Sequence, residues 1–182
     1  MNIAKMMKQA QQMQKKMGED LGRFEARLAG LEQGQQKIVD RVAPSVPEDK
    51  ETLWREAQNR NNSGMREDAR RFFRSFTQRF PQDPRASEAS LQVGRSFSLD
   101  GKHQQAAAEY QKVLEAYPKS PEVPEAMWLL GEAFVELKFC SDAKVLMQDL
   151  AKRYPRSPRA SGAKQRMREL QKIAKDKQRC TS

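Results

Sequence analysis

The stretches FPQDP at residues 80–84, YPKSP at 117–121 and YPRSP at 154–158 share an aromatic residue, two prolines and a serine or aspartate at fixed places. They recur at a spacing of 37 residues and then 37 again. Self-similarity at a fixed period of this length is typical of proteins built from stacked supersecondary units. We therefore predict three repeats, each ending at one of these stretches.

Each repeat is predicted to form two helices. In the second repeat, segments 86–99 and 104–116 flank a turn signal at Asp100-Gly101, and the proline that follows stops the second helix. We expect Gly94 and Ala106 to face each other, because only small side chains would let the two backbones approach closely. Alignment at the 37-residue spacing gives five matching sets: Ala69, Ala106 and Ala143; Phe73, Tyr110 and Met147; Phe76, Val113 and Leu150; Trp54, Leu91 and Trp128; Ala57, Gly94 and Gly131.

These positions resemble the tetratricopeptide repeat (TPR), which implies helical hairpins that bind other proteins. The matching residues of the third repeat are Met127, Leu130, Gly131, Phe134, Ala143, Met147, Leu150 and Pro155. Those of the second are Val93, Gly94, Phe97, Ala106, Tyr110, Val113 and Pro118. The first repeat departs from the pattern, since Glu56 and Arg60 replace apolar residues, which is typical of a terminal repeat with one solvated side.

The connector P-x-[SD]-P together with an upstream coiled coil resembles the YbgF/CpoB family of the bacterial Tol-Pal system. Outer-membrane assembly lipoproteins and gliding-motility repeat proteins use similar connectors. The YbgF/CpoB resemblance implies an envelope protein with an N-terminal oligomerising helix, acting in cell-envelope or cell-division organisation.

The fold class predicted is all-α: an N-terminal coiled-coil helix, three TPR hairpins and a C-terminal capping helix. The expected boundaries are a coiled-coil helix at 1–43, a linker at 44–50, a TPR domain at 51–175 and a basic tail at 176–182. Within the TPR domain the repeats are expected at about 51–85, 86–121 and 122–158, with the capping helix at 159–175. That helix has one apolar face, formed by Ala160, Ala163, Met167, Leu170 and Ile173.

The N-terminal segment carries an apolar residue every seven positions, a spacing that predicts a coiled coil. We expect it to make the chain a dimer or trimer through Ile3, Ala10, Met17, Leu21, Phe24, Leu28, Leu31 and Ile38. Two other interpretations stay open: that this seam docks on the repeats as ordinary core, or that it is an interfacial membrane anchor.

The net charge of +10 is concentrated at the two ends. Residues 1–17 carry four lysines and no acid, and residues 152–180 carry eleven Lys or Arg against Glu169 and Asp176. A basic surface can bind nucleic acid or anionic lipid. Residues 1–17 also resemble the start of the YbaB/EbfC nucleoid-associated proteins. A DNA-binding or membrane-surface protein is therefore the alternative to a protein scaffold.

The cysteines and the N-terminus bear on the compartment. Cys140 and Cys180 lie 40 residues apart with one histidine in the chain, which gives neither a zinc site nor a disulfide framework, so free thiols in a reducing compartment are expected. The sequence as written shows no signal peptide or membrane span and is expected to be cytoplasmic, or periplasmic if its start is wrong.

No enzyme activity, cofactor or metal is expected, because the chain has no Gly-rich phosphate loop, no G-x-S-x-G motif and no matched carboxylate pair. The sole histidine, His103, is interpreted as a structural residue at a helix start.

The expected partner site is a groove lined by the first helix of each repeat. It would present an apolar row of Trp54, Leu91 and Trp128 beside an acidic row of Glu51, Glu88 and Glu125, suited to a protein or peptide that carries Lys, Arg or a free amine. The alternative is that both tryptophans are core residues bridging adjacent hairpins. The complete set of groove residues is Glu51, Trp54, Gln58, Asn61, Glu88, Leu91, Arg95, Ser98, Glu125, Trp128, Glu132 and Val135.

Overall fold

The computed structural model describes residues 22–23, 26–27, 30–31, 45–173 and 180. The chain divides into two compact units, residues 1–45 and 46–182. In the first unit the described residues 22–23, 26–27 and 30–31 are helical. The coiled-coil seam lies outside the described residues except for Leu31, whose side chain is 66% exposed.

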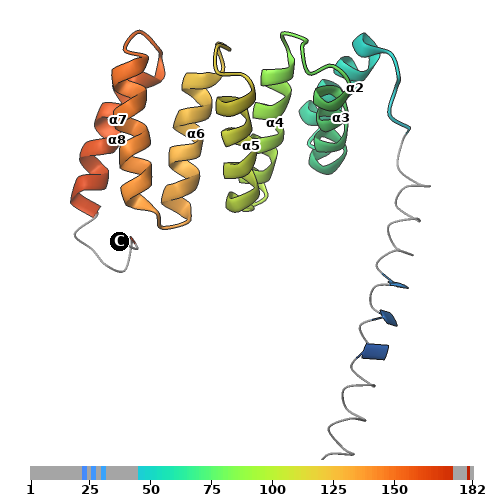
Figure 1. Cartoon of the computed structure of the whole chain (residues 1–182), viewed down its shortest axis with the longest axis horizontal. Helices are drawn as coiled ribbons and strands as arrows, with labels where there is room; N and C mark the ends of the chain where they lie inside the picture. The colour runs from blue at the N-terminus through green and yellow to red at the C-terminus, as the bar shows by residue number, and fades with distance from the viewer. Residues whose placement is uncertain (1–21, 24–25, 28–29, 32–44, 174–179, 181–182) are drawn as a thin grey trace, which may run out of the picture. The chain divides into compact units, whose positions relative to one another are not determined.

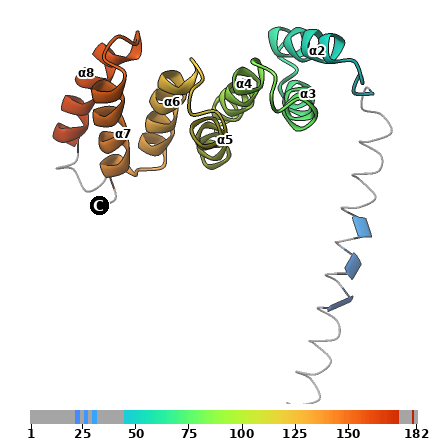
Figure 2. The ribbon, with the colours of Figure 1, turned by 45° about the horizontal axis from the view of Figure 1, so that its top comes forward.

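The second unit is a row of helices that pack against their neighbours in chain order (Figure 1), and the tilted view in Figure 2 shows the same succession. No strand occurs among the described residues, which confirms the all-α prediction. The helices are α2 (Lys50–Asn62), α3 (Arg66–Arg79), α4 (Ala86–Leu99), α5 (His103–Ala116), α6 (Val123–Glu136), α7 (Cys140–Arg153) and α8 (Arg159–Ile173). The helix pairs α2–α3, α4–α5 and α6–α7 are the three hairpins, and α8 packs on α7.

The proline connectors are built from two successive turns. In the first connector the amide of Asp83 donates to the carbonyl of Phe80 at 3.0 Å, and the amide of Ala86 donates to the carbonyl of Asp83 at 2.9 Å. Pro81 and Pro84 each occupy the second position of one of these turns, where the fixed φ of proline is favourable. The amides of Ser120 and Ser157 make the corresponding bonds in the other connectors. The spacing of the prolines thus sets how one hairpin follows another.

Two connected clusters of buried side chains form the core. The first joins the hairpins of the first two repeats to α6, and its largest members are Phe72, Phe73, Phe76 and Tyr110, each exposed by 1% or less. The second joins α6 and α7 to α8 around Met147, Leu150 and Leu170. Burial of one such large side chain is worth roughly 1.5–3 kcal/mol. The hairpins therefore share their cores with their neighbours instead of folding as separate units.

The polar residues of the first repeat cover its open side. Arg60 is hydrogen-bonded to the Glu56 carboxylate, and its guanidinium lies 3.9 Å from the ring centroid of Phe72. The stem of Arg60 shields the aromatic core while its charge is paired. This contact explains why Glu56 and Arg60 depart from the apolar repeat pattern.

The expected close approach of small residues within a hairpin occurs at Gly131, where a Cβ would lie 3.8 Å from the carbonyl oxygen of Ala143, but the nearest atoms at both aligned glycines belong to larger side chains. A Cβ atom on Gly94 would lie 2.4 Å from Cε1 of Tyr110, and one on Gly131 would lie 2.5 Å from Cε of Met147. The glycines thus make room for the large side chain four positions after the aligned alanine. Helical side chains project toward the preceding turn, so residues that face each other are not found by alignment of backbone positions alone.

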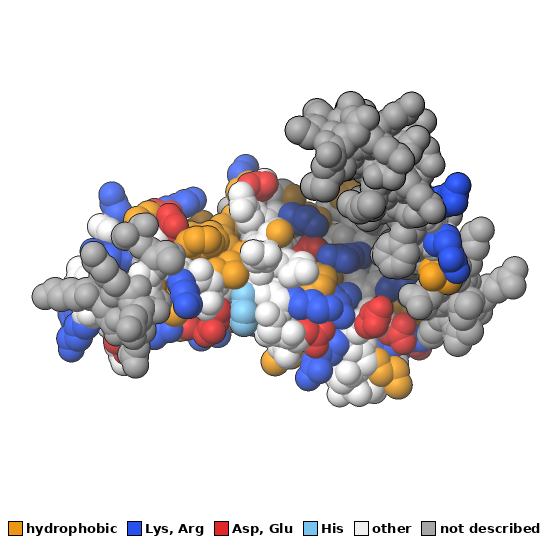
Figure 3. Space-filling view, turned by 90° about the horizontal axis from the view of Figure 1, so that it is seen from below, with side chains coloured by type: hydrophobic (Ala, Val, Ile, Leu, Met, Phe, Trp, Pro, Cys, Tyr) orange, Lys and Arg blue, Asp and Glu red, His pale blue; other side chains and the backbone are white. Residues whose placement is uncertain are grey.

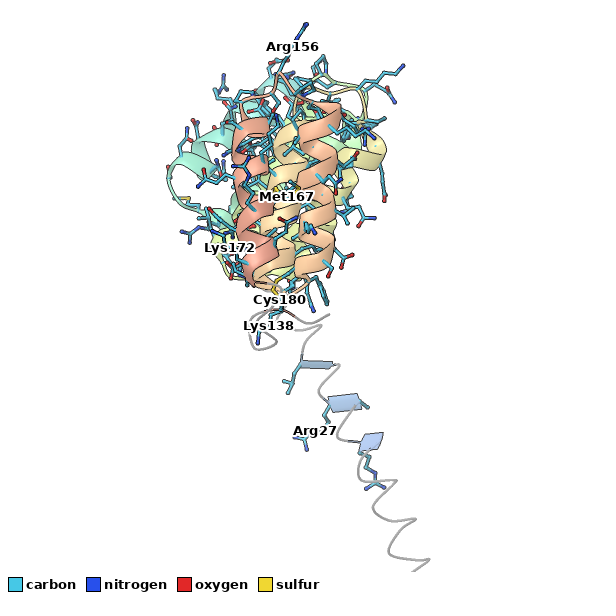
Figure 4. All side chains as sticks on the ribbon, turned by 90° about the vertical axis from the view of Figure 1, so that its left-hand side faces the viewer. Arg27, Lys138, Arg156, Met167, Lys172 and Cys180 are labelled. Carbon is cyan, nitrogen blue, oxygen red and sulfur yellow. A yellow bond between two sulfur atoms is a disulfide. The ribbon has the colours of Figure 1, made fainter. Side chains whose placement is uncertain are left out.

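The expected pair of free thiols is wrong, because Cys140 and Cys180 form a disulfide. Helix α8 packs on α7 and runs back along it (Figure 1), and Cys180 lies at the end of the stack at which α7 begins (Figure 4). Figure 4 shows Cys180 and Lys138 at one end of the stacked helices and Arg156 at the other. Separation in sequence therefore did not exclude proximity in space.

Candidate functional site

The predicted groove residues lie on α2, α4 and α6, and arginines of neighbouring helices contact two of their glutamates. Arg95 of α4 donates to Glu125 of α6 at 2.8 Å, and Arg166 of α8 donates to Glu132 of α6 at 2.9 and 3.1 Å. Ion pairs therefore link α6 to α4 on one side and to α8 on the other. We call this surface the first-helix face and define it by the groove residues predicted above.

The apolar row is not an open row of anchors. Leu91 is buried at 4% exposure. Trp54 is half-buried, and its ring centroid lies 5.6 Å from that of Phe73 and 5.1 Å from that of Phe76. These contacts pack Trp54 against the second helix of its own hairpin, whereas the alternative interpretation expected both tryptophans to bridge adjacent hairpins.

Trp128 bridges α6 and α8. A Cβ on Gly162 would lie 3.3 Å from its ring, so the glycine lets α8 approach the indole closely. The guanidinium of Arg159 lies 5.4 Å from the ring centroid. Arg85 lies at 5.3 Å over Trp54 in the same way. Each indole is thus covered by the arginine that directly follows the connector after its hairpin.

The acidic row is neutralised at both ends. Glu51 accepts two hydrogen bonds of 2.8 Å from Arg85, and Glu125 accepts bonds of 2.5 and 2.7 Å from Arg159. Arg85 and Arg159 each follow the second proline of a connector and lie 34 residues after their glutamate. In the middle repeat Glu122 takes this position, and it accepts a 2.7 Å bond from Ser87.

The ion pairs shift the protonation of the glutamates. The hydrogen bonds from Arg85 lower the pKa of Glu51, which is exposed. The hydrogen bonds from Arg159, followed by those from Arg95, lower the pKa of the half-buried Glu125. In the first connector, Arg85 also lowers the pKa of the buried carboxyl of Asp83. These carboxylates therefore stay ionised and paired well below neutral pH.

The remaining predicted residues have structural contacts or intermediate burial. Ser98 shares a 2.9 Å hydrogen bond with the hydroxyl of Tyr110. Half-buried side chains on the same helices are Gln58, Asn61, Glu88 and Val135.

Sequence reasoning missed the three arginines Arg85, Arg159 and Arg166. A signal was available, because an arginine directly after P-x-[SD]-P is separated by 34 residues from a glutamate in two of three repeats.

The charges elsewhere on the repeats are mixed. Figure 3 shows basic and acidic side chains interspersed on the face seen from below. Among the basic residues of the C-terminal region, Arg153 pairs with Asp149 at 3.0 Å, Arg159 with Glu125 and Arg166 with Glu132. Arg159 and Arg166 thus link α8 to α6, whereas the pair of Arg153 and Asp149 lies within α7.

A separate groove lies between α5 and α7, with α6 as its floor. Its volume is about 410 Å³. Its lining residues are Gln111, Leu114, Glu115, Leu130, Phe134, Asp142, Val145 and Leu146. Sequence reasoning did not predict it.

Comparison with known proteins matches residues 47–177 to the YfiO family, which is described as an outer membrane lipoprotein. The match covers more than half of the chain and includes all three hairpins and α8. The chain belongs to the YfiO family. Within the described part of this YfiO-family chain, no helix combines the length and the apolar composition needed to cross a membrane.

Among solved structures, one similar chain is titled "MamA RS-1 ArsTM double mutant". It is 16% identical, with a TM-score of 0.35, and the alignment covers 73% of this chain and 98% of that one. A likeness at this level supports no argument about function. No curated protein matches the chain.

Proposed function

We propose that this YfiO-family chain is a non-catalytic scaffold of the cell envelope that binds another protein on its stacked hairpins. The observation that carries the proposal is the continuity of the first-helix face, in which side chains of successive repeats are held by ion pairs such as Arg95–Glu125. Repeat proteins of this architecture use such extended surfaces for binding.

Two observations support the envelope as the compartment. A disulfide between Cys140 and Cys180 is stable in an oxidising compartment such as the bacterial periplasm and is rare in the cytosol. The matched family is described as an outer membrane lipoprotein. The resemblance of the connectors to YbgF/CpoB proteins adds cell-envelope and cell-division organisation as the setting. The proposed location corresponds to the periplasmic alternative given in the sequence analysis.

The coiled-coil segment is proposed to make the scaffold multivalent. Its heptad spacing supports self-association, which would present several copies of the repeats together and raise avidity without new contacts.

The ion pairs of α8 do not support the DNA-binding alternative. The arginines of α8 that the structure describes in ion pairs, Arg159 and Arg166, are held by glutamates of α6. No observation on the described residues favours nucleic acid over protein.

Site-specific photo-crosslinking in cells tests the scaffold function. A photoreactive amino acid at Glu88, on the first-helix face, should form a covalent adduct with one identifiable envelope protein. The same amino acid at Arg156, on an exposed connector, is the matched control and should not form that adduct. Gln58, on the same face, is a second position for the photoreactive amino acid. Adducts to the same protein from Glu88 and Arg156, or no adduct from either Glu88 or Gln58, would count against this face.

A further inference from the structure

The groove between α5 and α7 has an apolar lining and an acidic edge. Leu114, Phe134 and Val145 supply apolar surface, and the Val145 side chain is 64% exposed. Glu115 and Asp142 lie on opposite helices at the edge. A chain segment that filled this groove would have to present an apolar group and a positive charge together.

The preceding hairpins contain an equivalent groove that the protein fills itself. One repeat earlier, the positions equivalent to Gln111 and Phe134 are Arg74 of α3 and Phe97 of α4. The guanidinium of Arg74 lies 5.0 Å from the ring centroid of Phe97, and its Nη2 lies 2.5 Å from Oε1 of Glu109. Phe97 is buried, with 8% exposure.

A second arginine covers the same ring. Arg70 lies 4.6 Å from the centroid of Phe97, so two guanidinium groups cover this phenylalanine. Cation–π contacts of this kind contribute most where the groups are shielded from water.

Both arginines are missing from the groove between α5 and α7. Their equivalents are Ala107 and Gln111, and Gln111 instead donates a 2.7 Å hydrogen bond to Glu115 on its own helix. Phe134 is only half-buried and lines the open groove. The positions equivalent to Arg70 and Arg74 therefore supply no guanidinium to the ring of Phe134.

We propose that this groove binds an arginine of a partner protein. The guanidinium stacks on Phe134 and pairs with Glu115 or Asp142, and a neighbouring apolar side chain of the partner packs on Leu114 and Val145. The arrangement of Arg74 over Phe97 is its template within the same chain. The inference rests on the proposed scaffold function but uses a surface distinct from the first-helix face.

Selection of a random 12-residue peptide display library on the full chain tests the groove. Enriched peptides should contain an arginine beside a leucine, isoleucine, methionine or phenylalanine. Gln111→Arg should weaken their binding about tenfold, because the new arginine lies where Arg74 lies and occupies Phe134 itself. Gln148→Arg, which adds the same charge at an exposed position of α7, is the control and should bind like the wild type.

Replacement of the peptide arginine by citrulline keeps the shape and removes the charge. The citrulline peptide should bind the wild type about tenfold more weakly than the arginine peptide. The double variant Glu115→Gln with Asp142→Asn should bind the two peptides equally. Circular dichroism and thermal melting establish that each variant is folded.

Three results would overturn the groove assignment. The first is enrichment of peptides without arginine. The second is a set of peptides that bind Gln111→Arg as tightly as the wild type. The third is an equal loss of peptide affinity in Gln111→Arg and in Gln148→Arg. The first two leave the scaffold function standing if the Glu88 adduct is found. Dissociation of a self-assembled wild type by Gln111→Arg would instead identify a second copy of this chain as the occupant and exclude the proposed partner.

Discussion

At the scale of single residues, close contacts inside each hairpin depend on positions without a side chain. Gly94 faces the ring of Tyr110, which has 0% exposure and is held by the hydroxyl of Ser98. Gly131 faces the terminal methyl of Met147. The two sites offer the same space to a new methyl group but have neighbours of different stiffness.

Gly94→Ala should therefore cost stability, whereas Gly131→Ala should cost less or none. A forced shift of a packed ring costs about 1–3 kcal/mol. The thioether of Met147 can change rotamer, and alanine is favoured over glycine in a helix by about 1 kcal/mol. Urea unfolding of both variants measures the difference. Equal free energies of unfolding would show that the Tyr110 ring is not rigidly held.

The turn of the third hairpin carries a second residue-scale feature. Lys138 has φ of 67°, whereas the corresponding turns use Gly64 with φ of 72° and Gly101 with φ of 70°. A left-handed conformation costs a residue other than glycine roughly 1–2 kcal/mol.

Lys138→Gly should raise the free energy of unfolding by up to about 1 kcal/mol, since relief of strain is offset by the greater entropy of an unfolded glycine. Gly101→Ala is the reverse change and should lower it. Thermal and urea denaturation check both signs. A destabilised Lys138→Gly would mean that the interactions of the lysine side chain outweigh the strain.

At the scale of elements, the stacking of hairpins depends on links that cross from one repeat to the next. Glu125 takes part in two of these links, because it accepts hydrogen bonds from Arg95 of α4 and Arg159 of α8. The Cys140–Cys180 disulfide is a covalent link between the start of α7 and the chain beyond α8.

The pairing of Glu125 predicts a loss of stability in acid. Its pKa is lowered from the ordinary 4.5 by the Arg159 hydrogen bonds. A lowered folded pKa adds stability above the unfolded value, and this stability is lost as pH falls through the folded value. Urea unfolding from about pH 6 to about pH 3 should show a steeper decline for wild type than for Glu125→Gln. Parallel declines would assign the acid sensitivity to other carboxylates, such as Asp83.

Reduction of the disulfide should destabilise the C-terminal part of the repeats. Closure of a loop with a sequence separation of 40 residues corresponds to about 2–4 kcal/mol. Denaturation with and without dithiothreitol measures the change, and Cys180→Ser should be insensitive to the reductant. Two thiols that react with a maleimide in the untreated protein would contradict the disulfide.

At the scale of the whole molecule, the proposed assembly depends on the segment before the repeats. Deletion of residues 1–43 should convert an oligomer to a monomer, because the heptad seam lies in that segment, and should leave the helical repeats folded. Light scattering coupled to size-exclusion chromatography measures the mass.

Single substitutions in the described part of that segment test the heptad seam more specifically than the deletion does. Leu31→Glu places a charge on an exposed seam residue and should weaken association, whereas Arg27→Glu, at an exposed position outside the seam, should not. A monomeric wild type, or equal effects of both variants, would count against a coiled coil.

The sequence alone determined the all-α architecture of helical hairpins. Aromatic and proline residues recur at the connectors, and local turn chemistry follows from residue type, so the period of 37 predicted where each hairpin ends. Segment 86–99 is α4 as expected, and α5 begins one residue before the predicted segment, at His103. Helix type and connector position are local properties, which a sequence carries directly.

Only the tertiary structure decided what the side chains between repeats do. Whether Trp54 is an anchor or core depended on Phe73 and Phe76 of the neighbouring helix, and whether Glu125 is free depended on Arg159 of the capping helix α8. The disulfide and the open groove over Phe134 likewise depend on which helices pack side by side. Burial, ion pairing and covalent linkage are set by distances between atoms that are remote in sequence, and only folding fixes those distances.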